Sequence, residues 1–303
     1  MSKPTLVEFA NTDNIKLPGL LYEPSKKTEK VLINLHGNGS ASVFYSVERS
    51  NTFGEYLNRA GISFFTFNNI GAHYIKKLKK IEGEEEKDIK LGTAYELIRD
   101  CIKDIDGAVK FLKDLGYKEF YLMGHSTGAN KICVYNYYKP RSVFSKYLLV
   151  SGGDDTGMFY KYMGKKKFNF AIKRCRKYIR EGKGDKLIPK YLMDYIISYK
   201  SFYDTINPDG DYNIFSFNEV MNNLKLSKKR LFREIKSIKI PTLVMYGEND
   251  EYCYGAVSRC VNIVKKIVGK KDNFDFKIIK DTDHGFHSME IELAKTVVNW
   301  LMA

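Results

Sequence analysis

The segment Glu119-Phe-Tyr-Leu-Met-Gly-His-Ser-Thr-Gly128 decides the fold of this chain of 303 residues. Its first five residues have the apolar pattern of a buried strand, and a helical pattern follows it. A serine at the tip of a tight strand-to-helix turn takes a strained backbone conformation. Side chains two positions before and after it would collide, and Gly124 and Gly128 occupy those positions. The pattern therefore predicts a nucleophile elbow, with Ser126 exposed and the N–H of Thr127 free to donate to an oxyanion.

A serine in this position is inert until a base takes its proton. Among the five histidines, His284 lies in a tight loop between the strand pattern Phe274–Ile279 and the last helical pattern. This position completes a Ser…Asp/Glu…His order along the chain and predicts His284 as the base. His287 falls one turn into the helix, where packing or surface exposure is expected. The other histidines lie in a glycine turn, a charged loop and the elbow: His36, His73 and His125.

A third group has to orient the histidine. The run Pro241-Thr-Leu-Val-Met-Tyr246 has the pattern of a buried strand, and Asp250 follows it at the usual Gly-x-x-Asp spacing. Glu248 and Asp283 are the alternatives. Asp283 is next to His284 in the sequence, and neighbouring residues in a loop rarely point their side chains at each other. We therefore predict Asp250 as the acid.

With these motifs the sequence resembles the α/β-hydrolase superfamily over essentially its whole length. More narrowly, it resembles the domain-of-unknown-function 1749 group, which includes fungal hydrolases that open ester-linked siderophores. Four segments carry the narrower resemblance: Gly92-Thr-Ala-Tyr-Glu96, the elbow form His125-Ser-Thr-Gly128, Ser198-Tyr-Lys-Ser-Phe202 and Asp209-Gly-Asp-Tyr-Asn-Ile-Phe215. The resemblance does not fix a substrate.

Strand and helix patterns alternate along the chain, and the motifs follow strand patterns, so we expect a doubly wound, mostly parallel α/β sheet. The superfamily resemblance implies a core domain of residues 1–155 and 240–303. It implies that residues 156–239, inserted between two strands, form a helical cap over the site. It also implies that the N–H of Asn38, in His36-Gly-Asn-Gly39, is the second oxyanion donor beside that of Thr127.

The net charge of +14 is concentrated in the insertion, where Thr156 to Ile240 contains 20 Lys and Arg against 8 Asp and Glu, or +12. Such a segment can attract an anionic substrate, an anionic membrane face or nucleic acid, or it can simply keep the surface soluble. No nucleic-acid-binding motif is present. Just before the insertion, Asp154 and Asp155 follow a strand pattern and are candidates for substrate contact or for an alternative acid.

Composition excludes several classes of protein. The sequence contains no apolar run of about 18 residues, so no membrane span or stable membrane insertion is expected. Its first residues lack the apolar core of a signal peptide. The five cysteines are scattered and show no metal-binding spacing with histidine. We therefore expect reduced thiols, a cytoplasmic location, and a reaction that needs no metal or organic cofactor.

These residues predict a serine hydrolase that cleaves a carboxylic ester through an acyl-enzyme, with a small-molecule ester, anionic or neutral, as substrate. The same triad serves thioesterases, amidases, acyltransferases and hydroxynitrile lyases, and a non-catalytic ligand-binding homologue is a further alternative. The acyl and alcohol parts of the substrate and the oligomeric state stay open.

Local patterns also predict secondary structure around the site. The dense charges of Lys76–Lys90 are typical of a solvated loop, and Thr93–Leu115 has the spacing of one long helix. In the insertion, helices are predicted near Phe168–Gly182, Leu187–Ser198 and Ser216–Asn223, and Ser227–Lys236 is a further helical candidate.

Overall fold

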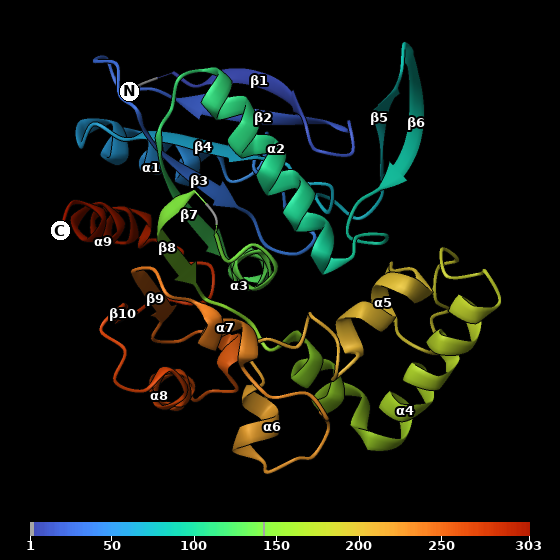
Figure 1. Cartoon of the computed structure of the whole chain (residues 1–303). Helices are drawn as coiled ribbons and strands as arrows, with labels where there is room; N and C mark the ends of the chain where they lie inside the picture. Colours follow the sequence, from blue (N-terminus) through green and yellow to red (C-terminus); the bar gives the residue numbers. More distant parts are fainter. Residues whose placement is uncertain (1–2, 142) are drawn as a thin grey trace.

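The computed structural model describes residues 3–141 and 143–303. Eight strands form one sheet: β1 (Thr5–Ala10), β2 (Lys16–Tyr22), β3 (Lys30–Leu35), β4 (Ser63–Phe67), β7 (Glu119–His125), β8 (Phe144–Val150), β9 (Thr242–Gly247) and β10 (Phe274–Ile279). Their order across the sheet is β1-β2-β4-β3-β7-β8-β9-β10 (Figure 1). β2 runs antiparallel to β1 and β4, and the remaining neighbours are parallel. The sheet is therefore mostly parallel, as predicted.

Helices cover both faces of this sheet: α1 (Val47–Arg59), α2 (Cys101–Asp114), α3 (Thr127–Tyr138), α8 (Val257–Val268) and α9 (Glu290–Met302). One apolar cluster joins a face of the sheet to α2, α3 and α8, and a second joins the other face to α1 and α9. Strands covered on both faces have mostly apolar side chains, and every residue of β4 and β9 is buried. The arrangement is doubly wound.

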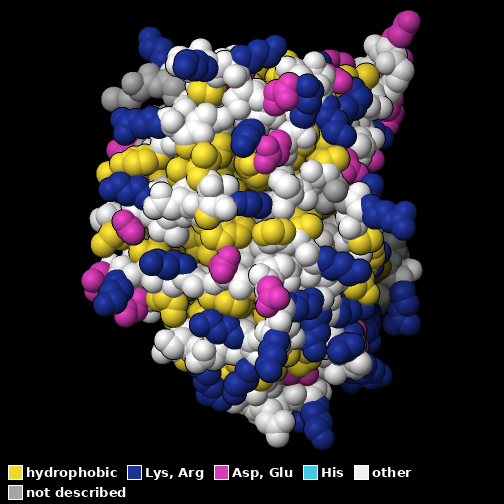
Figure 2. Space-filling model, turned by 60° about the vertical axis from the view of Figure 1, so that its left-hand side comes forward, with side chains coloured by type: hydrophobic (Ala, Val, Ile, Leu, Met, Phe, Trp, Pro, Cys, Tyr) yellow, Lys and Arg dark blue, Asp and Glu magenta, His cyan; other side chains and the backbone are white. Residues whose placement is uncertain are grey.

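The insertion between β8 and β9 contains four helices: α4 (Asp155–Arg180), α5 (Tyr199–Ile206), α6 (Phe217–Met221) and α7 (Arg233–Ser237). α4, α5 and the segment between them enclose an apolar cluster of their own, which includes Phe168 and Phe202. Phe217 and Phe232, from the later part of the insertion, belong instead to the main core. Lys and Arg side chains gather on the lower part of the molecule, at the level of the insertion (Figures 1 and 2).

The prediction of a solvated loop over Lys76–Lys90 is wrong, because this segment forms an antiparallel hairpin of β5 (Lys76–Glu82) and β6 (Glu85–Leu91). The hairpin projects at the upper right of Figure 1. Lys79 lies opposite Asp88, and their side chains form a 3.0 Å ion pair across the strands. Cross-strand pairs of opposite charge stabilise a hairpin whose composition alone looks like a loop.

Three helix predictions also need correction. A short 3-10 turn, Ile98–Asp100, precedes α2, whereas residues 93–95 form a turn in which the N–H of Tyr95 donates to the carbonyl of Gly92 at 2.9 Å. Leu187 and Ser198 face each other in an antiparallel bridge instead of ending a helix. α4 begins well before Phe168, because Asp154 accepts a hydrogen bond from the N–H of Gly157 and caps it.

The predicted helices of the later insertion are shorter than their patterns suggested. α6 covers only the centre of the range 216–223, and α7 only the end of the range 227–236. The five cysteines are all buried and free, as the expectation of reduced thiols requires. None of the helices in residues 3–141 and 143–303 has the length and apolar character that crossing a bilayer requires.

Candidate active site

Ser126 lies at a sharp turn between the end of β7 and the start of α3. Its backbone has φ 57° and ψ −125°, a left-handed region that residues with a side chain rarely adopt. A Cβ atom on Gly124 would lie 2.3 Å from the carbonyl carbon of Gly128. A Cβ atom on Gly128 would lie 2.3 Å from the carbonyl oxygen of Leu35. Both glycines are therefore required for this turn to form, as the sequence pattern indicates.

His284 reaches the same place from the loop between β10 and α9. Its Nδ1 atom lies 3.0 Å from both carboxylate oxygens of Asp250, whose side chain is only 1% exposed. The carboxylate accepts the Nδ1–H, which leaves Nε2 of His284 as the nitrogen able to take a proton. Asp250 is itself fixed, because one of its oxygens accepts a hydrogen bond from the N–H of Tyr252 at 3.0 Å.

The alternative acids and bases have other partners. Asp283 accepts hydrogen bonds from Nδ1 of His287 at 2.6 Å and from its N–H at 3.1 Å. Glu248 accepts from the N–H of Asp281 at 3.2 Å. His287 is 75% exposed, in keeping with a surface residue. His73 has a left-handed backbone in the turn before β5, and its N–H donates to the carbonyl of Ser40.

Asn38 and Thr127 line the same pocket as Ser126 and His284. Thr127 is the first residue of α3, where backbone N–H groups lack partners within the helix. The loop that carries Asn38 is held by Thr93, whose Oγ1 accepts from the N–H of Gly39 at 2.8 Å. The same hydroxyl donates to the carbonyl of Gly71 at 2.7 Å. The role of Thr93 was not apparent from the sequence, although it lies in one of the segments that carry the family resemblance.

The histidine loop is held by three contacts that the sequence analysis missed. Nε2 of His125 donates to the carbonyl of His284 at 2.7 Å, and Arg49 on α1 donates to the carbonyl of Gly285. The N–H of His284 donates to Glu251 at 3.1 Å. Burial, with the charges of His284 and Arg49, lowers the pKa of His125 to about 3, so its ring is neutral. The partners are far apart in sequence, and local patterns carry no signal of their pairing.

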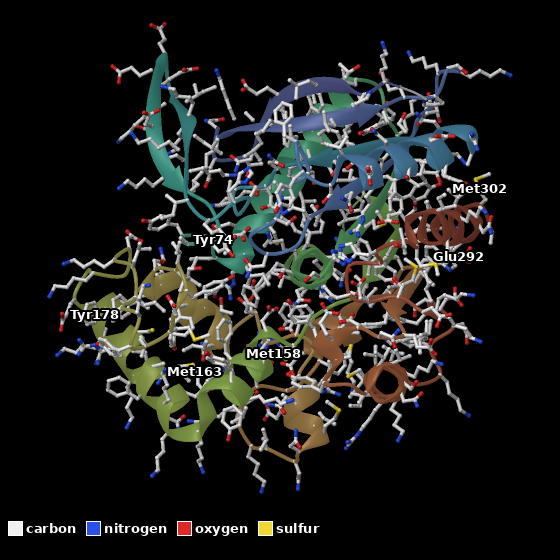
Figure 3. All side chains as sticks on the ribbon, turned by 180° about the vertical axis from the view of Figure 1, so that it is seen from behind. Tyr74, Met158, Met163, Tyr178, Glu292 and Met302 are labelled. Carbon is white, nitrogen blue, oxygen red and sulfur yellow. The ribbon has the colours of Figure 1, made fainter. Side chains whose placement is uncertain are left out.

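The pocket that contains these residues has a volume of about 550 Å³. One wall comes from the insertion: Met158, Phe159 and Tyr162 of α4, with Met193 and Tyr195 from the following segment. Figure 3 shows Met158 near the middle of the molecule and Tyr178, farther along α4, at its outer edge. The insertion therefore encloses part of the space in front of the serine with apolar and aromatic side chains.

Asp154 and Asp155 lie at the end of β8 on the pocket wall, as expected, but they differ in their contacts. Asp154 accepts hydrogen bonds from two backbone N–H groups and from the hydroxyl of Tyr254. One of these N–H groups belongs to Gly157, so Asp154 caps the start of α4. Asp155 accepts from Nδ2 of Asn130 at 3.2 Å. Burial raises the pKa of Asp154 to about 7 and that of Asp155 to about 6. Asp250, rather than either of them, contacts the imidazole of His284.

A family model described as a protein of unknown function (DUF1749) matches residues 91–302. The matched range includes all four segments that carry the narrower resemblance. The chain belongs to this family. No curated protein matches the sequence.

Several solved structures are similar to the chain over nearly its whole length. An esterase of Pyrococcus furiosus has a TM-score of 0.58 and 18% identity, over 99% of this chain and 92% of that one. An esterase of Butyrivibrio proteoclasticus with ferulic acid bound has a TM-score of 0.61 and 16% identity, over 97% of each chain. A thermostable carboxyl esterase of Bacillus coagulans has a TM-score of 0.61 and 13% identity, over 99% of this chain and 98% of that one. These similarities confirm the predicted α/β-hydrolase fold of the DUF1749 protein.

Proposed function

We propose that the chain is a serine hydrolase that cleaves a carboxylic ester, with Ser126 as nucleophile, His284 as base and Asp250 as acid. The observation that carries the proposal is the meeting of a strained serine and an aspartate-bound histidine in one pocket. Solved proteins of similar fold from three organisms are esterases, which supports ester cleavage among the reactions open to such a triad.

In the proposed reaction each of these groups has one role. Nε2 of His284 takes the proton of Ser126 as the hydroxyl oxygen attacks the acyl carbon, and Asp250 stabilises the imidazolium that forms. The N–H groups of Asn38 and Thr127 donate to the oxyanion of the tetrahedral intermediate. His284 then protonates the leaving alcohol. Water, activated by the same histidine, hydrolyses the acyl-enzyme and restores the serine.

We also propose that residues 156–239 act as a cap on a core domain of residues 1–155 and 240–303. Two observations support this division. The first part of the insertion has an apolar cluster of its own, and its side chains form one wall of the pocket. A substrate that enters the pocket would therefore contact both parts, and the cap would exclude water from the ester during reaction.

A substrate panel with a covalent probe tests the proposal. The wild-type protein and Ser126→Ala are assayed on matched p-nitrophenyl esters, thioesters and anilides, and both are treated with a fluorophosphonate. We expect ester hydrolysis and labelling at Ser126 in the wild type, and neither in the variant. Faster turnover of thioesters or amides would move the activity to those alternatives. A wild-type serine that is not labelled would indicate a non-catalytic ligand-binding homologue.

A further inference from the structure

A small cavity with both polar and apolar lining residues continues the active-site pocket behind the glycine turn of residues 36–40. Its volume is about 60 Å³, enough for a carboxylate or for one or two water molecules. Five residues line both this cavity and the pocket: Gly37, Ser40, Ser46, Arg49 and His125. Gly37 packs against Ser126 and His125 precedes it in the chain, so the cavity lies beside the reacting serine.

Arg49 is the charged group of this cavity, and no acidic side chain lines it in the part of the chain that the structure describes. The guanidinium donates to the carbonyl of Gly285, but its Nε is buried and has no hydrogen-bond partner among the described residues. Burial lowers the pKa of Arg49, and the carboxylates of Glu290 and Asp283 counter this only in part. A buried, unpaired N–H of a cation is costly, and an acceptor in the cavity would remove that cost.

Four serines line the cavity together with Arg49. Ser42 and Ser50 are buried and line the cavity, and Ser40 and Ser46 continue the hydroxyl wall toward the pocket. Each hydroxyl rotates to donate to whatever acceptor is present. Together with Nε of Arg49 they can satisfy both oxygens of a carboxylate, and a charge-assisted hydrogen bond is stronger than a neutral one.

The charge on the lining of the cavity also favours a negative group. Burial, with the charge of Lys131, lowers the pKa of His36 to about 3, and burial with neighbouring positive charge does the same for His125. Both rings are therefore neutral and add no charge to the wall. The charged neighbours that act on these rings from outside the cavity include Lys131 and Lys76. Carboxylates act from outside as well, because Asp250 opposes the lowering of the His125 pKa, so the guanidinium of Arg49 is the charge that reaches the lining among the described residues.

We propose that this cavity is a subsite for a carboxylate on the acyl part of the substrate, so that the preferred substrates are half-esters of short dicarboxylic acids. The subsite rests on the proposed function, because it lies beside Ser126 and the ester must react there. Nε of Arg49 and the hydroxyls of Ser42 and Ser50 donate to the carboxylate, which takes the place of water. The interaction orients the acyl chain and does not take part in bond breaking.

Binding tests the subsite independently of turnover. Calorimetry with Ser126→Ala compares succinate and glutarate with butanoate and pentanoate, the matched acids that lack the second carboxylate. We expect the dicarboxylates to bind about 10- to 100-fold more tightly, the range of a charge-assisted hydrogen bond. Equal affinities would mean that the cavity holds water only and would overturn the proposal. Tighter binding of methyl phosphate than of any dicarboxylate would overturn the assignment to a carboxylate.

Steady-state kinetics of proteins that retain Ser126 test the preference for a substrate with a carboxylate. The ratio of kcat/KM for ethyl hydrogen succinate to that for ethyl pentanoate is measured in wild type, Arg49→Met and Ser50→Ala. We expect Arg49→Met and Ser50→Ala to lower this ratio, Arg49→Met by about tenfold or more. The control is Arg59→Met, an exposed arginine at the end of the same helix, which should leave both activities unchanged.

The outcomes separate the subsite from the proposed function. If Arg49→Met lowers both activities equally, Arg49 acts only through the carbonyl of Gly285 and the subsite is wrong. If both esters are hydrolysed with no preference in the wild type, the subsite is also wrong, while the esterase proposal stands. If neither ester is hydrolysed in a manner that depends on Ser126, the proposed function fails, and the calorimetric comparison still decides whether the cavity binds a carboxylate.

Discussion

His284 shares its Nδ1 atom between the two oxygens of Asp250, each at 3.0 Å, whereas Asp283, its neighbour in the sequence, binds His287. The carboxylate of Asp250 is almost completely buried, so its interaction with the ring is little weakened by solvent. This contact fixes the tautomer with a hydrogen on Nδ1. Nε2 is then the free base.

Asp250→Asn should lower kcat by about 10³- to 10⁴-fold, because the amide favours the wrong tautomer of His284. The measurement is steady-state kinetics on a p-nitrophenyl ester at one pH. Glu248→Gln and Asp283→Asn are the controls and should retain most of the activity, since both carboxylates have other partners. A large loss in either control, with activity retained in Asp250→Asn, would assign the acid to that residue.

Ser126→Ala and His284→Ala should each lower kcat by roughly 10³-fold or more while the fold is retained. The two residues act as a unit, so the double variant should lose little beyond either single one. Kinetics are measured with each preparation checked by circular dichroism. Losses that multiply in the double variant would show that the two side chains do not act in the same step.

Thr93→Val should lower kcat about tenfold and leave KM nearly unchanged. Valine has a similar shape but cannot accept from Gly39 or donate to Gly71, so the loop that carries Asn38 loses its anchor. A displaced oxyanion donor weakens binding of the transition state more than that of the substrate. Thr93→Ser keeps the hydroxyl and should restore kcat, which a loss of packing alone would not allow. An unchanged kcat in Thr93→Val would show that other contacts hold the loop.

Parts of the site were predictable because their patterns are local. The glycines around Ser126 have the spacing of a tight strand-to-helix turn, and this spacing is visible in the sequence alone, although Gly128 also makes room for the carbonyl of Leu35 on β3. Asp250 and His284 each follow a strand of the parallel sheet, whose carboxyl ends share one edge. Position along the chain therefore carried information on position in space.

Other parts depend on contacts between distant segments, which one sequence does not reveal. Arg49 and His125 hold the histidine loop from two separate elements. The hairpin of β5 and β6 is stabilised by pairs such as Lys79 with Asp88, which are recognised only once the strand register is known. Without that register, alternating lysines and acids look like a solvated loop.

Acid should destabilise the protein partly through His36. Nδ1 of His36 donates to the carbonyl of Gly37 at 2.8 Å, and Nε2 accepts from the N–H of Asn69 at 3.2 Å. A proton on Nε2 would abolish the hydrogen bond from Asn69 and place two N–H groups against each other. Burial lowers the pKa of the ring to about 3. An unfolded histidine has a pKa of about 6.5. The unfolded state therefore binds the proton first, and stability is lost as the pH falls from about 6.5 toward 3.

The expected loss from His36 is about 2 kcal/mol at pH 5 relative to pH 7.5. Urea unfolding at several pH values gives the slope of the free energy of unfolding against pH. His36→Gln should reduce that slope by the amount that corresponds to the uptake of about one proton. His287→Gln replaces an exposed histidine and serves as the control. The same slope in His36→Gln and in wild type would contradict a neutral, buried His36.

The basic insertion allows a test of electrostatic steering. Its net charge of +12 lies on the segment that forms one wall of the pocket. If that charge serves function, it raises the rate of encounter with anionic esters, and added salt weakens the effect as the Debye length falls from about 30 Å at 0.01 M to about 10 Å at 0.1 M. We expect kcat/KM for an anionic ester to fall with salt, and that for a neutral ester of equal size to stay constant.

Lys165, Lys166 and Lys167 are the residues to change. They lie within α4, just after its kink at Gly164, rather than before the first helix of the insertion as the sequence suggested, and all three are exposed. Reversing them to Glu should flatten the salt dependence for the anionic ester without altering kcat for the neutral one, because none of them lines the pocket. The measurement is kcat/KM for both esters from 0.01 to 0.2 M salt, a range set by the Debye length. If both esters respond alike to salt, the basic surface keeps the protein soluble and does not steer substrates.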